Sequence, residues 1–145
     1  MQRSHELLDA YTRMFQDIQE GRITSANDFL SDSDEVSAIG TDASEWLMGR
    51  ENLVPILDAQ FEWFRQGGAT FDTSRAEAWT EGDLGFVVDQ LTVTLKDGRS
   101  VQMRATSVLR KENGEWKMVH PHYSIGVPNE QVEAFQGFEE VVEKA

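Results

Sequence analysis

The sequence predicts an α+β fold in which helices come first and an antiparallel sheet follows. Two stretches of the first half carry apolar residues at helical spacing. The second half consists of extended runs separated by Glu81-Gly82-Asp83, Asp97-Gly98 and Asn113-Gly114, which favour turns. With 145 residues, no repeat and no linker, the chain is expected to form one domain over residues 1–145.

Helices are expected over residues 4–21 and from Arg50 to Gly67-Gly68. In the first, Ser4 is suited to cap the N-terminus and Gly21 to end the helix. Its apolar stripe consists of Leu7, Leu8, Tyr11, Met14, Phe15 and Ile18. The inward residues of the second are Leu53, Ile56, Leu57, Phe61 and Phe64. Between them the sequence indicates a short helix over residues 25–30 and one or two short strands over residues 35–48.

The Asn113-Gly114 dipeptide favours a two-residue hairpin turn, so Glu112 is expected to pair with Glu115. That register places Ser107 opposite His120 and Ala105 opposite His122. Because side chains alternate along a strand, the two histidines share a face, and Trp116 and Met118 share it with them. The pattern predicts the lining of an apolar recess.

The long strands carry apolar groups on both faces, with Phe86 on one side and Val87 on the other. One face is expected to meet the helices, and the outer sheet face is expected to form a homodimer. The Asp97-Gly98 turn places Asp89 and Arg104 diagonally on one face, where an ion pair between subunits is expected.

The last segment is expected to be a helix that opens at Pro128-Asn129. Val132, Phe135, Phe138 and Val142 keep helical spacing within it. Two roles are open for this helix, because it either caps the open end of the fold or exchanges contacts across a dimer.

The composition excludes several classes of function. A formal charge of −13 without a basic cluster argues against binding to nucleic acid or to an anionic membrane. Nothing approaches a membrane span or a signal peptide, and the absence of cysteine suits a reducing compartment, so a cytoplasmic location is expected. His120 and His122 give two ligands where zinc needs three or four, so neither a metal nor a cofactor is expected.

Two stretches, Ile39-Gly40-Thr41-Asp42 with Trp46 to Glu51, and Gly114 to Ser124, carry a resemblance to a known family. They resemble the SnoaL-like group of the nuclear transport factor 2-like (NTF2-like) superfamily. The second stretch also resembles the final strand of the association domain of calcium/calmodulin-dependent kinase II. The resemblance implies a cone, in which a curved antiparallel sheet wraps around N-terminal helices and a C-terminal helix follows.

This fold hosts isomerases, dehydratases, cyclases, transport adaptors and assembly modules, so the fold does not decide the function. The first hypothesis is a protein that holds a small, largely apolar or aromatic molecule in the cone. The alternatives are a cofactor-independent isomerase, dehydratase or cyclase that uses acid–base catalysis, and an oligomerisation module without catalysis. In the kinase association domain, arginines bind acidic ligands at the positions of Ser107 and Tyr123, so a neutral ligand is expected here.

Catalysis in this fold needs a buried base and a donor for a developing oxyanion. The aspartate of the family's enzymes is missing from residues 39–41, so His120, His122 and Asp42 are the candidate catalytic residues. The structural alternative is that the histidines satisfy neighbouring carbonyl or hydroxyl groups. The candidate ligand-binding residues offer apolar, aromatic or hydroxyl groups: Tyr11, Trp46, Phe61, Trp79, Phe86, Met103, Ser107, Trp116, Met118 and Ser124.

Overall fold

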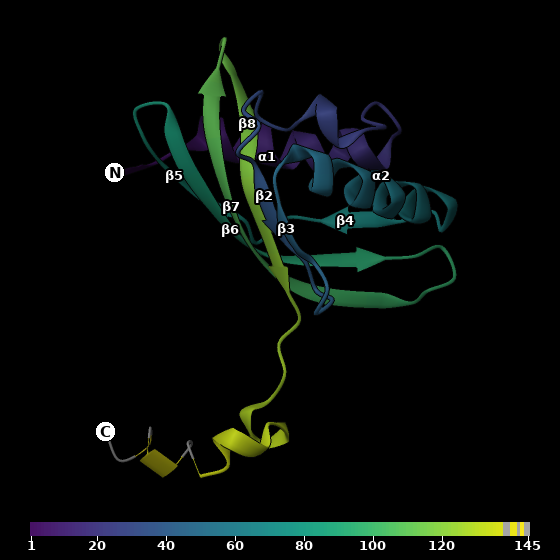
Figure 1. The fold of residues 1–145 in the computed structure, drawn as a ribbon, viewed down its shortest axis with the longest axis vertical. Coiled ribbons are helices and arrows are strands. Elements are labelled where there is room, and N and C mark those ends of the chain that lie inside the picture. The colour runs from purple at the N-terminus through teal and green to yellow at the C-terminus, as the bar shows by residue number, and fades with distance from the viewer. Residues whose placement is uncertain (138–139, 142, 144–145) are drawn as a thin grey trace.

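The computed structural model describes residues 1–137, 140, 141 and 143, and it has the expected α+β architecture (Figure 1). The helices are α1 (His5–Gln19) and α2 (Arg50–Gln66), with 3-10 turns η1 (Ala26–Asp28), η2 (Asn129–Gln131) and η3 (Glu133–Phe135). The strands are β1 (Gln2–Arg3), β2 (Ser37–Ile39), β3 (Trp46–Met48), β4 (Thr70–Asp72), β5 (Glu77–Glu81), β6 (Leu84–Thr94), β7 (Ser100–Glu112) and β8 (Glu115–Ser124).

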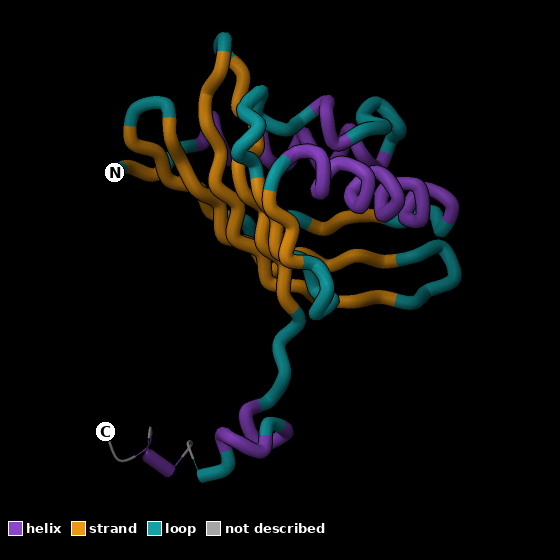
Figure 2. The backbone as a smooth tube through the Cα atoms, in the orientation of Figure 1, coloured by secondary structure: helices purple, strands orange, loops and turns teal. Residues whose placement is uncertain are grey.

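One sheet contains all the strands, in the order β1-β5-β6-β7-β8-β2-β3, with β4 paired to the far end of β6. All neighbours are antiparallel except β2 and β8, which meet in parallel where Ile39 pairs with His122. Figure 2 shows both helices on one side of this bent sheet. The sheet therefore has an inner face toward the helices and an outer face away from them.

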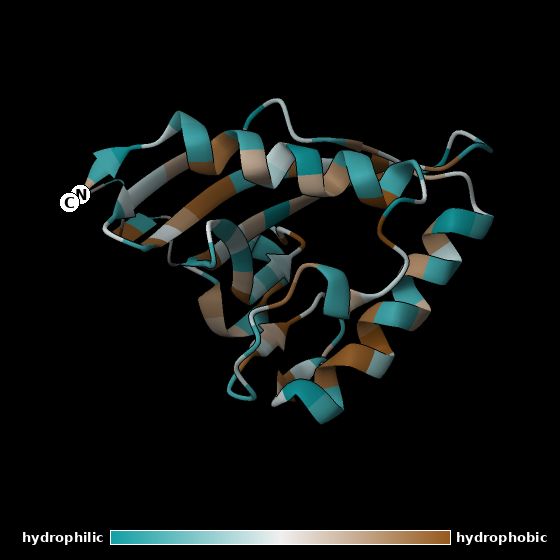
Figure 3. Cartoon of the chain, turned by 90° about the horizontal axis from the view of Figure 1, so that it is seen from above, coloured by the Kyte–Doolittle hydropathy of each residue, from teal (hydrophilic) through white to brown (hydrophobic). Residues whose placement is uncertain are grey.

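Both long helices form where the sequence predicts them. The Ser4 hydroxyl accepts a hydrogen bond from the Leu7 N–H at 3.0 Å, and α1 ends two residues before Gly21. The second helix ends at Gln66, directly before Gly67. Figure 3 shows apolar and polar residues alternating along both helices, as amphipathic segments require. Their apolar sides pack on the inner face of the sheet.

Close approach of α1 to the sheet depends on Gly85 in β6. A Cβ at this position would lie 2.6 Å from Leu7 Cδ2 and 2.7 Å from the Trp79 carbonyl oxygen. The backbone contact cannot be relieved by rotating a side chain. We expect Gly85→Ala to lower the free energy of unfolding by about 2 to 4 kcal/mol, measured by urea denaturation. Gly126→Ala is the matched control, because its Cβ would meet only ordinary contacts beyond 3.7 Å; equal stability of the two variants would contradict this view of the packing.

The predicted β7–β8 register is correct only near the turn. Glu112 pairs with Glu115 as expected, but a β-bulge after the Leu109–Met118 pair leaves Val119 without an opposite residue. Beyond it, His120 pairs with Val108 and not with Ser107. His122 likewise pairs with Thr106 and not with Ala105. Because one inserted residue reverses the side-chain alternation, the histidines lie on the outer face while Met118 is buried in the core.

The β6–β7 register also differs from the expected one. The loop that contains Asp97-Gly98 has three residues, since Leu95 N–H donates to the Arg99 carbonyl at 2.8 Å. Asp89 therefore pairs with Ala105 on the inner face, and Arg104 pairs with Gln90 on the outer face. The predicted ion pair between Asp89 and Arg104 is wrong, because the two side chains point to opposite sides of the sheet.

The segment after β8 does not form the expected continuous helix. It makes the two short turns η2 and η3, with Val132 extended between them, and Gly137 has a φ of 86°. Phe138 and Val142 of the predicted stripe lie outside the described residues. Figure 1 shows the segment leaving the end of β8 and lying apart from the cone. Most helical stability in proteins comes from tertiary packing of an amphipathic face. In the described part of the chain, no helix is long and apolar enough to cross a membrane.

Candidate functional site

An apolar cavity of about 80 Å³ lies between the two long helices and the inner face of the sheet. The side chains of the helices and strands that line it are mostly aliphatic, aromatic or thioether groups. The lining residues are Met14, Phe15, Ile18, Phe29, Gly40, Thr41, Glu45, Leu57, Gln60, Phe61, Phe64, Phe71, Leu91, Met103, Met118, Pro121 and Tyr123. Such a recess with few polar groups is the usual form of a small-molecule site.

Polar groups of the cavity wall gather where the β2–β3 turn meets α2. Gln60 Nε2 donates to Glu45 Oε2 at 2.5 Å, and the Asp42 N–H donates to Glu45 Oε1 at 3.2 Å. The Glu45 carboxylate packs against Gly40, where a Cβ would collide with it. The turn and α2 thus place one carboxylate and one amide, respectively, at the edge of an otherwise apolar space.

A second polar group lies on the inner face of β6, on the same side of the sheet as the cavity residue Leu91. Asp89 precedes the cavity residue Leu91 by two positions on β6, so both side chains point inward. Asp89 is 5% exposed, and Tyr11 is fully buried. The Tyr11 hydroxyl donates to Asp89 Oδ2 at 3.1 Å. Asp89 Oδ1 has no hydrogen-bond partner among the described residues, and the Ser107 hydroxyl lies beside the phenol of Tyr123.

Burial controls the ionisation of this cluster. Desolvation raises the pKa of Asp89 to about 6, although the hydrogen bond from Tyr11 acts in the opposite direction. Desolvation also raises the pKa of Tyr11 and of Tyr123, so both phenols stay protonated. Asp89 can therefore take up or release a proton near neutral pH, which is the range that a general acid or base needs.

The structure gathers five of the predicted ligand-binding residues at or beside the cavity. Phe61, Met103 and Met118 line it directly. Tyr11 and Ser107 belong to the buried cluster next to it. Burial raises the pKa of the cavity residue Tyr123, a hydrogen bond with Ser107 lowers it, and the charge of Asp89 raises it further, so both residues lie near this phenol.

The remaining candidates lie elsewhere. Trp79 and Phe86 stack on the outer face with ring centroids 5.1 Å apart, and the bulge brings Ser124 to the same face. Trp46 is 69% exposed on β3. His120 and His122 lie on the outer face, 6.3 Å apart between ring centroids. The roles assigned to these residues stay predictions, but none of them lines the cavity.

Asp42 and Trp116 occupy surface positions. Asp42 is exposed in the β2–β3 turn and accepts hydrogen bonds from the Ser44 N–H and hydroxyl, which lower its pKa. Trp116 lines an open groove of about 410 Å³ between α1 and the β8 tip, and its Nε1 donates to Glu6 Oε1 at 3.1 Å. Acidic side chains surround this groove, so it is a poorer match to an apolar ligand. Among the described residues, no three His, Asp or Glu side chains are grouped to hold a metal ion.

The sequence interpretation did not include Asp89 or Glu45 among the candidate site residues. For Asp89 a signal existed, because strict alternation places it between Val87 and Leu91 on the face that packs on the helices. A carboxylate that interrupts a buried apolar face is a candidate functional group. For Glu45 no local pattern distinguishes it from the exposed residues of the same turn.

The comparisons with known proteins agree with this geometry. The profile of the SnoaL-like domain matches residues 7–128. An NTF2-like protein of unknown function from Pseudomonas putida KT2440 superposes with a TM-score of 0.69 at 19% identity, over 89% of this chain and 88% of that one. A candidate dehydratase of the NTF2-like family from Streptomyces avermitilis gives 0.64 at 16% identity, over 84% and 94%.

A candidate calcium/calmodulin-dependent kinase II association domain from Xanthomonas campestris is also similar, with a TM-score of 0.60 at 21% identity over 81% of this chain and 86% of that one. A search of curated proteins finds no significant match. The fold and its inner cavity define an NTF2-like cone. The chain belongs to the SnoaL-like family.

Proposed function

We propose that the cone holds a small, largely apolar molecule whose polar group is directed toward Asp89. The observation that carries this proposal is the buried Asp89 carboxylate, with one oxygen unpartnered among the described residues, beside an apolar cavity. An unpaired buried polar group costs stability, so it indicates a site where a ligand completes the hydrogen bonds. We further propose that this protein acts in the cytoplasm, where a chain without cysteine is unaffected by reducing conditions.

The lining restricts the chemistry of the ligand. Apart from Thr41, Glu45 and Gln60 near the β2–β3 turn and the phenol of Tyr123, the lining side chains are apolar. An anionic ligand would lose its hydration there beside the Glu45 carboxylate and without a cationic group, so a neutral molecule with one or two hydrogen-bonding groups fits better. The cavity is small, but Met103 and Met118 are flexible thioethers that can adapt to a larger guest.

A panel of neutral steroids, aromatic polyketides, terpenoids and small acids, screened by thermal shift, tests this function. A ligand that binds only the folded state stabilises it by about 2.7 kcal/mol at a hundredfold excess over its dissociation constant. We expect neutral apolar compounds to raise the melting temperature and small acids to have no effect.

Filling the cavity is expected to remove that response. Leu57 lines the cavity and is 8% exposed, so Leu57→Phe places a ring in the empty space. The variant should keep its melting temperature within a few degrees, since the cavity offers room for the added volume. A compound from the panel that raises the melting temperature of the wild-type chain should no longer raise that of Leu57→Phe. Ile56→Phe is the matched control, because Ile56 is adjacent on α2 but 39% exposed. A hit that stabilises both variants equally binds outside the cone.

Acid–base catalysis is the second candidate function. A carboxylate with a pKa of about 6 can exchange a proton with a bound substrate at neutral pH, as an isomerase, dehydratase or cyclase requires. In that case the Asp89→Asn variant should still bind a compound found in the screen but should no longer convert it. An oligomerisation module would show no thermal shift with any compound and no effect of Leu57→Phe.

A further inference from the structure

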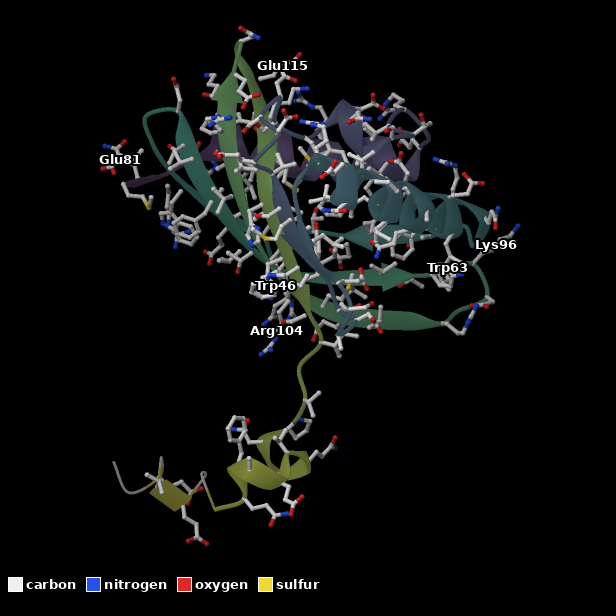
Figure 4. All side chains as sticks on the ribbon, viewed as in Figure 1. Trp46, Trp63, Glu81, Lys96, Arg104 and Glu115 are labelled. Atoms are coloured by element: carbon white, nitrogen blue, oxygen red, sulfur yellow. The ribbon has the colours of Figure 1, made fainter. Side chains whose placement is uncertain are left out.

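A recess of about 260 Å³ lies next to the inner cavity, between the C-terminal ends of α1 and α2 and strand β4. Lys96 packs against Gly68, which lines the recess. Figure 4 shows Lys96 at the C-terminal end of α2, on the opposite side of the molecule from Glu81. Four side chains line both the cavity and the recess, and they form a wall between two neighbouring chambers: Ile18, Phe61, Phe64 and Phe71.

The inner cavity alone is small for the ligand that the proposed function requires. Its volume of about 80 Å³ is well below the range of roughly 300 to 1,000 Å³ that is usual for small-molecule sites. The two chambers together exceed the lower limit of about 300 Å³. A ligand of ordinary size therefore has room only if it occupies both.

The wall between the chambers consists largely of phenylalanine rings in contact. The ring centroid of Phe71 lies 5.4 Å from that of Phe15 and 5.5 Å from that of Phe64. Phe64 and Phe71 are only half-buried, so a rotation of either ring can open a passage. A passage between packed rings is narrow, and it admits a chain of methylene groups more readily than a fused ring system.

Strand β6 sets the order of the polar group, the cavity and the recess. Asp89, Leu91 and Val93 follow one another on its inner face. Leu91 lines the cavity, and Val93 pairs with the wall residue Phe71. From Asp89 to Val93 the strand rises about 13 Å, a distance that an extended chain of about ten carbon atoms covers. The three places therefore lie along one line.

The far side of the recess is polar and open to water. Gln19, Arg65 and Thr70 line it there, and all three are exposed. Gln19 Oε1 accepts a hydrogen bond from the Phe71 N–H at 3.0 Å, and Arg65 forms an ion pair with Glu62. Apolar groups that reach these residues are no longer removed from water, so the apolar part of a ligand ends there.

We propose that the two chambers bind one long-chain aliphatic molecule, whose neutral polar end lies beside Asp89 and whose chain crosses the phenylalanine wall into the recess. This rests on the proposed function, because the inner cavity is the same site. A straight chain is apolar along its length and narrow enough for the wall. It also fits the distance from Asp89 to the recess.

Isothermal titration calorimetry with 1-butanol, 1-hexanol, 1-octanol and 1-decanol tests the proposal. We expect the dissociation constant of the wild-type chain to fall by about fourfold for each added methylene group up to 1-decanol. Leu57→Phe, which fills the inner cavity, should weaken the binding of all four alcohols.

Arg65→Trp places an indole in the recess and leaves the inner cavity unchanged. This variant should bind 1-butanol as the wild type does, but 1-decanol more weakly by at least tenfold, roughly. Gln66→Trp is the matched control, because Gln66 is the next residue of α2, is exposed and lies outside the recess. It should follow the wild type with all four alcohols. Circular dichroism should show both variants folded, since neither replaces a buried side chain.

The possible failures distinguish this proposal from the proposed function. A wild-type affinity that stops rising at 1-hexanol would overturn the role of the recess but leave the inner cavity as a binding site. Equal gains with chain length in Arg65→Trp and the wild type would also overturn it. If no alcohol binds while another neutral compound of the panel does, the long-chain class is wrong. If no compound binds, the proposed function fails as well.

Discussion

Asp89→Asn is expected to stabilise the protein at pH 8, by about 2 to 3 kcal/mol, although it removes a side chain placed beside the candidate site. The ionised carboxylate is buried, and desolvation raises its pKa from 3.8 to about 6. Each pKa unit corresponds to about 1.4 kcal/mol, so the folded state carries a penalty of about 3 kcal/mol above pH 6. Asparagine keeps an oxygen that accepts from Tyr11 and carries no charge.

The sign of the pH dependence follows from the raised pKa. Below pH 3.8 the carboxyl group is protonated in both states and makes no difference. Between pH 3.8 and about 6 the unfolded chain loses the proton while the folded chain keeps it, so this group's contribution to stability falls as the pH rises. Above about pH 6 the loss is complete and constant.

Urea denaturation over this pH range measures the effect. We expect the stability difference between Asp89→Asn and wild type to grow from near zero at the acid end to its full value above pH 6. Asp9→Asn, at an exposed carboxylate on α1, should stay close to wild type throughout. An Asp89→Asn variant less stable than wild type at pH 8 would contradict the desolvated carboxylate. A more stable variant that no longer converts a hit would indicate that the chain keeps Asp89 for function at the expense of stability.

The predictable parts of this fold are those where local chemistry decides the structure. Ser4 and Gly21 delimit α1 because capping and helix termination depend on a few neighbouring atoms. Asn113-Gly114 fixes the first pairs of the β7–β8 hairpin for the same reason, with φ of 52° and 80° at the two residues. These elements, together with the SnoaL-like match, confirm the predicted fold class.

The site was harder to predict, because it depends on which face each strand turns to the helices. One unpaired residue, Val119, moves His120 and His122 from the expected recess to the outer face. A sequence signal for this bulge exists in Pro121, which lacks an N–H and is rare inside a paired strand unless a bulge is near. Glu45 gave no such signal, because its position depends on contacts with Gly40 and with Gln60 of α2, which no periodic pattern in the turn itself reveals.

A buried hydrogen-bonded group around Ser31 holds one wall of the cavity in place. The Ser31 hydroxyl donates to Glu112 Oε2 at 2.5 Å, and the Asp32 N–H donates to Glu112 Oε1 at 3.0 Å. Arg110 adds hydrogen bonds to both Ser31 Oγ and Glu112 Oε2, each at 2.9 Å. The loop that contains Phe29, a cavity residue, is thereby tied to the end of β7.

Glu112→Gln is expected to lower the free energy of unfolding by about 2 kcal/mol at pH 7. Burial raises the pKa of Glu112, but the hydrogen bonds from Ser31, Asp32 and Arg110 outweigh it and hold the pKa at about 2. The lowered pKa means that this contribution is present above pH 4.5 and is lost as the pH falls toward 2. The shift alone would imply more than 3 kcal/mol, roughly, but solvent screening around the partly exposed Arg110 reduces it.

Glu115→Gln is the matched control, because Glu115 lies across the same turn with its side chain 75% exposed. It should change stability by less than about 0.5 kcal/mol. Hydrogen exchange distinguishes a local effect from a global one, since the Ser31 N–H donates to the Met118 carbonyl at 2.8 Å and loses protection once the loop detaches. Glu112→Gln should speed exchange there more than in α1, and a uniform increase across both would mean that Glu112 stabilises the whole fold without holding the cavity wall.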